Sequence, residues 1–392
     1  MELGEHKVVI SGVGQSDIGR RLNRTGLDLT VQAALAAVDD AGLQLSDIDG
    51  ISTWPGAATD AAPGFSPCGA ADLKEALRLE LSWYSAGPEG AAQYAAVVNA
   101  VAAVATGLAN NVLCFRTATE STSQSLGRPA SVVGLGGSRV SGPIAYMAPY
   151  NAISAANWIG MMAQRHMHEF GTTREQLGQI PLTCRAHAQL NPRAIYRDPL
   201  TLEDYLAARM ISTPFCLYDC DIVVDASTVI VVSRADRQAD LRAPVRIEAM
   251  GTALRDRSSW YQQADFTQMA SVDAAASMWE RTDLTTADVD CVQLYDGFSY
   301  IALAWLEALG FCGHGEGGPF VEGGRLRLGG ELPMNTHGGQ LSAGRLHGYG
   351  FLYEAVVQLR GEAEGRQVDG AEVAVAAAGG GPLAGAFLLT RS

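Results

Sequence analysis

Two stretches of this chain, about 241 residues apart, share one succession of predicted elements. A helix predicted at Leu27–Ala41 is followed by the turn Asp47-Ile-Asp-Gly-Ile51, and a helix at Ala274–Arg281 is followed by Asp288-Val-Asp-Cys-Val292. A predicted strand precedes each helix, at Val8–Gly14 and at Val245–Ala249. The alternative is a chance likeness between two unrelated βαβ units. We favour an internal duplication, which predicts two similar α/β halves packed together with a site at their junction.

A long insertion separates the two repeats. We expect one half at residues 1–120, the insertion and the end of that half at 121–240, and the other half at 241–392. Helical spacing and capping residues predict helices within the insertion, at Trp158–Phe170, Thr173–Gln179 and Thr201–Met210. We expect this insertion to cap or shape a pocket.

Two further runs predict strands. Ile222–Val232 lacks strict alternation of apolar and polar residues, so we predict two short strands around Asp225. The C-terminus is typical of a hairpin, with strands at Ala371–Ala378 and Ala384–Thr390 on either side of a glycine turn. The glycines of that turn would let the backbone approach a bound substrate; they are Gly379, Gly380 and Gly381.

Composition excludes several classes of function. The formal net charge is −14, whereas a nucleic-acid-binding protein carries a basic surface. The N-terminus has no signal-like pattern and no apolar run reaches about 18 residues, so we expect a cytoplasmic protein without a membrane span. The 7 cysteines are odd in number and scattered, which favours free thiols in a reducing compartment over disulfides or a metal site.

Four side chains in polar segments of the second half could transfer protons. Tyr295 and Asp296 follow a predicted strand, and His337 precedes two glycines. Tyr349 stands between two glycines, which favours a loop. Tyr295 could also be only a core residue, and Asp296 could only cap the helix that follows it. The chain contains no Walker, Rossmann or serine-hydrolase motif.

Several motifs together resemble one branch of a known superfamily. They include Arg165-His-Met-His-Glu-Phe-Gly-Thr-Thr-Arg174, Asn191-Pro-Arg-Ala-Ile-Tyr196, Asp219-Cys-Asp221, Tyr295-Asp-Gly-Phe-Ser299 and Asn335-Thr-His-Gly-Gly339. They span nearly the whole chain and look like the sterol-carrier and lipid-transfer-protein branch of the thiolase superfamily. The resemblance implies an α/β thiolase fold, in which duplicated βαβαβαββ halves form a five-layered αβαβα sandwich.

The chain departs from thiolases at the positions that carry their chemistry. The nucleophilic cysteine falls at or near Gly90, and Ala377 replaces the acid/base cysteine. A Gly-His-Pro motif has become Gly344-Arg-Leu346, and Tyr295 stands in place of a histidine. Thiolysis needs a thiolate that holds the acyl group covalently, so we do not expect ordinary thiolase activity. A retro-aldol reaction needs only a base, an acid and donors for a thioester enolate.

This pattern resembles the actinobacterial steroid side-chain-cleaving aldolases. The resemblance implies that the Cα–Cβ bond of a β-hydroxyacyl-CoA steroid side chain (17-hydroxy-3-oxo-pregnene-20-carboxyl-CoA type) is cleaved to a 17-ketosteroid and propionyl-CoA. It implies that Tyr295 and Tyr349 are catalytic, one as the base and the other as acid or enolate donor. His337 and Asp296 would support them, and Gly379–Gly381 would bind the substrate. CoA enters as part of the substrate, and no cofactor or metal is expected in this chain.

The same resemblance implies a partner. Such aldolases work with a DUF35 protein that contains a zinc ribbon and an OB-fold, so zinc is expected only in that partner. A homodimer of this chain would carry one partner on each side, as an α2β2 assembly. Two other functions stay open. One is a non-catalytic sterol or acyl-CoA carrier. The other is a thiolase-like acyltransferase or thioesterase, either cysteine-independent or using a remaining cysteine such as Cys291.

Overall fold

Nine strands form one continuous sheet in the order β3-β2-β4-β7-β1-β8-β11-β10-β9. This computed structural model describes residues 3–57, 63–87, 90–125, 144–255, 257 and 259–392. The strands of the sheet are β1 (Val8–Gln15), β2 (Gly50–Thr53), β3 (Trp83–Ala86), β4 (Asn111–Thr119), β7 (Asp225–Arg234), β8 (Val245–Leu254), β9 (Cys291–Leu294), β10 (Val373–Gly379) and β11 (Leu383–Arg391). A small separate sheet pairs β5 (Met210–Ser212) with β6 (Phe215–Cys216).

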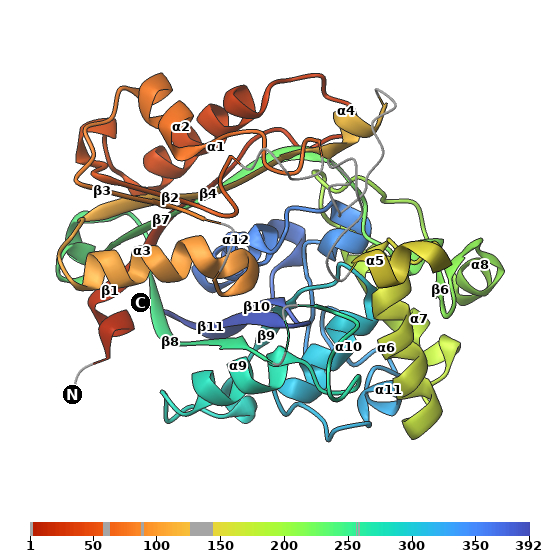
Figure 1. The fold of residues 1–392 in the computed structure, drawn as a ribbon. Coiled ribbons are helices and arrows are strands. Elements are labelled where there is room, and N and C mark those ends of the chain that lie inside the picture. Colours follow the sequence, from red (N-terminus) through yellow and green to blue (C-terminus); the bar gives the residue numbers. More distant parts are fainter. Residues whose placement is uncertain (1–2, 58–62, 88–89, 126–143, 256, 258) are drawn as a thin grey trace.

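Helices cover both outer faces of the sheet halves and fill the space between them (Figure 1). α1 and α2 lie outside β3-β2-β4-β7-β1, α9 and α10 lie outside β8-β11-β10-β9, and α3 and α12 lie between the two layers of strands. This is the expected five-layered αβαβα arrangement. The helices are α1 (Gly26–Ala41), α2 (Ala70–Leu77), α3 (Ala95–Ala105), α4 (Glu120–Ser125), α5 (Ile144–Met147), α6 (Ala155–Phe170), α7 (Arg174–Gln189), α8 (Leu202–Ala207), α9 (Ala270–Trp279), α10 (Ser299–Ala308), α11 (Gly317–Phe320) and α12 (Tyr349–Arg360).

The two halves of the sheet repeat one topology. In the first half β1 pairs antiparallel with β7, β7 antiparallel with β4, and β4 parallel with β2. In the second half β8, β11, β10 and β9 pair in the same order and with the same directions. β1 and β8 join the halves through the pairs Val9–Arg246 and Ile10–Val245. The duplication predicted from the sequence is therefore present in the fold.

The matched aspartates of the two repeats are structural. Asp47 and Asp288 each accept a backbone hydrogen bond that closes the 3-10 turn before the strand. Asp49 and Asp290 each accept hydrogen bonds from the first backbone N–H groups of the neighbouring parallel strand, β4 or β10. The distances to Asn111 N and Val373 N are both 2.9 Å. The same two contacts explain why the motif occurs twice.

Small residues set the spacing between helix and sheet. Thr25 accepts a hydrogen bond from Asp28 N and begins α1, and Gly42, at φ 73°, ends it. The buried face of α1 is largely alanine and lies against β1. A Cβ on Gly14 of β1 would lie 2.3 Å from Ala33 O, so the strand and helix need that glycine to pack this closely.

One strand prediction was wrong. Residues around Asp225 form a single strand, β7, because its run is buried on both faces and needs no polar alternation. The Asp225 carboxylate is satisfied inside the protein, since it accepts hydrogen bonds from the backbone N of Leu22 and Thr122, both at 2.9 Å. The C-terminal hairpin of β10 and β11 was predicted correctly.

The insertion forms its own helical group beside α10 (Figure 1). α6 begins three residues earlier than predicted and ends as predicted, before Gly171 at φ 78°. α7 is longer than predicted and continues through Pro181, whereas α8 is shorter. Residues 126–143 of the insertion lie outside the described part of the chain. Within the described part, no helix combines the length and apolar character needed to cross a membrane.

Candidate active site

A cavity of about 260 Å³ lies at the junction of the two halves. The central helices α3 and α12 both begin close to it, so their positive ends favour negative charge there. Aromatic rings from both halves and from the insertion line it, among them Trp54, Phe65, Trp158, Trp260 and Phe298. Trp158 and its neighbours Ala155 and Ile159 of α6 thus form part of the cavity wall. Polar side chains enter at one part of the wall, namely Glu120, Asp221, Tyr295, Arg345 and His347.

Tyr295 follows β9 and lines this cavity. Its ring packs over Gly297, where a Cβ would come within 2.7 Å of the ring. Burial raises the pKa of the Tyr295 phenol, and the nearby Asp221 raises that pKa further. The phenol is therefore protonated at neutral pH and is poised to donate a hydrogen bond.

Tyr349 is the first residue of α12 and is fully buried. It does not lie in a loop, because Gly348, at φ 89°, turns the chain directly into the helix. The Tyr349 hydroxyl has no hydrogen-bond partner within the described residues, and the residue is not among those lining the cavity. Burial raises the pKa of this phenol, while the nearby Arg116 lowers it.

Arg116 places a buried guanidinium behind the cavity wall, near Glu120. The side chain comes from β4 and is 1% exposed. Nη1 donates to Thr117 O at 2.6 Å, but Nε and Nη2 have no partner in the described part of the chain. The guanidinium lies 4.5 Å from the centre of the Phe65 ring. Burial lowers the pKa of Arg116 to about 10, so the group is still charged at neutral pH.

Sequence reasoning missed a second group of charged residues. Arg345 bridges two carboxylates, with Nη2 2.7 Å from Glu120 Oε1 and Nη1 3.1 Å from Asp221 Oδ1. His347 Nε2 lies 3.0 Å from Glu120 Oε2. The available signals were the Asp219-Cys-Asp221 motif and the arginine that replaces the thiolase histidine. These signals could be interpreted only together with Glu120, which comes from the first half of the sequence and pairs with Arg345 and His347 in the fold.

Burial and the ion pairs shift the pKa values of Glu120 and Asp221 in opposite directions. Burial alone would raise the pKa of Glu120, but Arg345 and His347 outweigh it and lower the pKa to about 2. Burial raises the pKa of Asp221 to about 6, although Arg345 opposes the shift. Burial also lowers the pKa of His347 to about 3, so its imidazole is neutral at pH 7.

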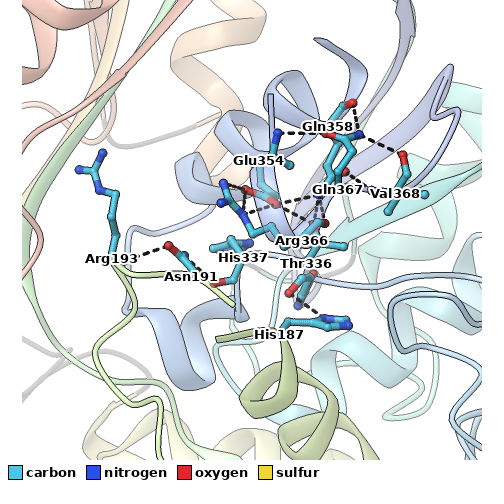
Figure 2. A network of polar contacts seen from close by, with 12 residues as sticks. His187, Asn191, Arg193, Thr336, His337, Glu354, Gln358, Arg366, Gln367 and Val368 are labelled. Atoms are coloured by element: carbon cyan, nitrogen blue, oxygen red, sulfur yellow. Dashed lines mark hydrogen bonds and ion pairs between the residues drawn. The ribbon is translucent and has the colours of Figure 1, made fainter. Parts of the chain in front are cut away.

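His337 lies in a different cavity. That space, of about 280 Å³, is lined by Asn191, Arg193 and one face of α12. Figure 2 shows His337 near the buried Glu354–Arg366 ion pair, whose Nε and Oε1 are 2.9 Å apart. The backbone oxygen of His337 accepts from Asn191 Nδ2 at 2.8 Å. The structure does not bring this imidazole to the cavity that Tyr295 lines.

Asp296 is buried behind the cavity and braces the segment Gly339–Ala343. Its Oδ1 accepts a hydrogen bond of 2.8 Å from Gln340 N, and it does not cap α10. A Cβ on Gly339 would lie 1.9 Å from Asp296 Oδ2, so only glycine fits there. Burial raises the pKa of Asp296 to about 7.

Two of the three hairpin glycines, Gly380 and Gly381, make room for tryptophan side chains. Gly379 lines the cavity, and its carbonyl accepts from Trp305 Nε1 at 3.2 Å. A Cβ on Gly380 would lie 2.9 Å from Trp305 Nε1, and one on Gly381 would lie 2.4 Å from the Trp260 ring. Trp260 itself lines the cavity, so Gly381 affects the shape of the cavity through that indole ring.

None of the described residues that line this cavity is a cysteine. Ala377 is buried in β10, and Gly90 precedes α3; Pro88 and Glu89 lie outside the described residues. Cys291 is buried in β9, and burial raises the pKa of its thiol to about 12. Within the described part of the chain, no three His, Cys, Asp or Glu side chains are grouped so as to hold a metal ion.

The fold and this site define a class of protein: a thiolase-superfamily chain without the thiolase cysteines. A family model described as "Thiolase C-terminal domain-like" matches residues 252–389. The steroid side-chain-cleaving aldolase of Thermomonospora curvata is 33% identical over 385 residues, which cover 97% of each chain. The chain therefore belongs to the steroid side-chain-cleaving aldolases, which are carbon–carbon lyases of the thiolase superfamily.

Two further relatives agree with this assignment. The 17-hydroxy-3-oxo-4-pregnene-20-carboxyl-CoA lyase of Mycobacterium tuberculosis is 33% identical over 390 residues, covering 97% of this chain and 99% of the relative. The solved structure named "Ltp2-ChsH2(DUF35) aldolase" superposes with a TM-score of 0.88 and 31% identity. It covers 100% of this chain and 99% of that one.

Proposed function

We propose that this chain cleaves the Cα–Cβ bond of a β-hydroxyacyl-CoA steroid side chain, of the 17-hydroxy-3-oxo-pregnene-20-carboxyl-CoA type, to give a 17-ketosteroid and propionyl-CoA. The observation that carries the proposal is the cavity at the helix starts, where a phenol and a charged cluster line the wall and none of the described lining residues supplies a thiol. Aromatic lining suits a steroid. The names of the two relatives support the same substrate class.

The reaction needs positive charge and proton donors where an enolate develops. Arg345 enters the cavity, Arg116 stands behind it, and α3 and α12 direct their N-terminal ends toward it. We assign Tyr295 and Tyr349 as the catalytic phenols. Because burial keeps both protonated, they suit hydrogen bonding to the enolate oxygen and protonation of its carbon. In this proposal CoA is part of the substrate, the chain itself needs no cofactor, and Gly379–Gly381 shape the substrate pocket.

We further propose that the working enzyme contains a DUF35 partner. The similar solved structure is named as a complex with such a protein, and this supports the pairing. An α2β2 assembly of two such chains and two partners, with zinc only in the partner, is the form we propose. Size-exclusion chromatography with light scattering on the co-expressed proteins measures the stoichiometry directly.

The function is tested with the co-expressed complex and a steroid bearing a β-hydroxyacyl-CoA side chain. We expect equal amounts of 17-ketosteroid and propionyl-CoA without added free CoA. Binding of the substrate with no product, from a folded complex, would instead identify a carrier. Loss of activity after thiol alkylation would favour acyl transfer through a cysteine. Either result would contradict the proposal.

A further inference from the structure

The two carboxylates in the cavity wall differ in how far their oxygens are engaged. Glu120 accepts from Arg345 at both oxygens and from His347 at one of them. Asp221 accepts one side-chain hydrogen bond, from Arg345 Nη1 to Oδ1. Among the described residues, none donates a hydrogen bond to Asp221 Oδ2. Asp221 therefore presents a free carboxylate oxygen to a cavity that it lines.

Backbone contacts hold this carboxylate beside Tyr295. Asp221 N donates to Gly297 O at 3.2 Å, two residues after Tyr295. Arg345 N donates to Ile222 O at 2.8 Å, which brings the guanidinium to the same stretch of chain. The phenol, the carboxylate and the guanidinium thus stand on one wall of the cavity, positioned by rigid main-chain hydrogen bonds.

We propose that Asp221 is the general base of the carbon–carbon cleavage, with its free Oδ2 taking the proton of the substrate β-hydroxyl while Arg345 holds it in position. This inference rests on the proposed function. The O–H electron pair forms the ketone C=O bond, the Cα–Cβ pair becomes the thioester enolate, and the proton stays on Asp221. Tyr295 then protonates the enolate carbon, and Asp221 returns its proton to the phenolate. Every group is restored, and no further reactant is needed.

The electrostatics favour Asp221 over the other candidates. A base works best when its pKa lies near the working pH, and the pKa of Asp221 is about 6. Glu120, with a pKa of about 2, is a much weaker base, and both phenols have raised pKa values. Asp221 interacts electrostatically with five titratable or charged groups. They are Arg345, Glu120, Tyr295, Asp296 and Cys220.

The test uses the complex with its partner and compares Asp221→Asn with wild type. We expect kcat to fall by at least about 100-fold, because a positioned base contributes roughly that much or more. Substrate affinity, measured by calorimetry, should stay within about 3-fold, since affinity does not depend on the base. Wild-type kcat/KM should fall about 10-fold from pH 7 to pH 5, as a base with a pKa near 6 becomes protonated.

Two variants distinguish a catalytic role of Asp221 from a purely structural one. Asp221→Ala should regain activity when formate is added, because a small carboxylate can replace the missing base but not a missing fold. Asp40→Asn is the matched control, since Asp40 also pairs with an arginine, Arg360 at 2.7 Å, and is not among the residues lining the cavity. It should keep kcat.

The outcomes distinguish this inference from the proposed function. An Asp221→Asn enzyme with near wild-type kcat and an unchanged pH profile would overturn the inference alone. So would an Asp221→Ala enzyme that binds substrate but gains nothing from formate. If Asp221→Asn does not fold, the Asp221→Glu variant provides the test. The longer side chain moves the carboxylate, so a catalytic base at this position must change kcat and the apparent pKa of the pH–rate profile. A folded wild-type complex that cleaves no such substrate would overturn the function itself.

Discussion

Burial keeps the phenols of Tyr295 and Tyr349 protonated, and this decides what each residue can contribute. A free phenolate would have been the stronger base, but an apolar wall disfavours its charge. The sequence showed which aromatic residues stand in place of the thiolase groups. It did not show their surroundings, because Glu120 and Arg345 are 225 residues apart and meet only in the fold.

The two tyrosines should respond differently to loss of the hydroxyl. Tyr349→Phe removes a buried hydroxyl without a hydrogen-bond partner in the described residues, so stability should stay equal or rise slightly. Tyr295→Phe should lower kcat by about 100-fold or more with little change in substrate affinity. Thermal unfolding and steady-state kinetics on both variants check this. A Tyr295→Phe enzyme with normal kcat would remove this residue from the mechanism.

Asp296 should make the protein less stable as the pH rises. Its folded pKa of about 7 lies above the ordinary value, so between about pH 4 and pH 7 the folded state binds more protons than the unfolded state. Stability from this group is therefore lost as the pH rises through that window. Asp296→Asn should gain stability relative to wild type from pH 4 to pH 7. A pH-independent difference in urea unfolding would contradict this.

At the scale of elements, strands and helices with strong local signals were predictable, and the site was only partly so. The hairpin of β10 and β11 and helices α1 and α6 follow from glycine positions, caps and apolar spacing. β7 was missed because a strand buried on both faces has no alternation. His337 was predicted from its residue type, yet it lines a different cavity from the one that Tyr295 lines.

The repeated aspartates give an element-scale prediction. Asp49→Ala and Asp290→Ala should each cost about 1–3 kcal/mol in free energy of unfolding, since each removes charged hydrogen bonds to backbone N–H groups. Because the two sites lie in different halves, their effects should add in the double variant. Urea unfolding of the two single variants and the double variant measures this. A strongly non-additive double variant would show that the two turns are coupled.

At the scale of the whole molecule, the two halves share one sheet and one interior. β1 pairs with β8, and α3 and α12 lie between the layers of strands (Figure 1). The ion pair of Arg360 with Asp40 crosses between the halves. A site at this junction can combine Glu120 from one repeat with Tyr295 and Arg345 from the other.

This shared interior should make the halves unfold together. Hydrogen exchange measured by mass spectrometry in increasing denaturant should show β4 and β10 losing protection at the same concentration. Two well-separated transitions would mean that each half is stable alone. The site would then depend on docking of two independent units.

The central claim is that a carbon–carbon bond is broken through an enolate without any covalent acyl-enzyme. The most direct test is cleavage in D₂O of a substrate whose β-hydroxyl carries ¹⁸O, followed by mass spectrometry of both products and of the intact protein. We predict one deuterium at Cα of propionyl-CoA, ¹⁸O retained in the ketone, and an unchanged protein mass. An acyl adduct on the chain, or a product formed only when free CoA is added, would contradict the claim.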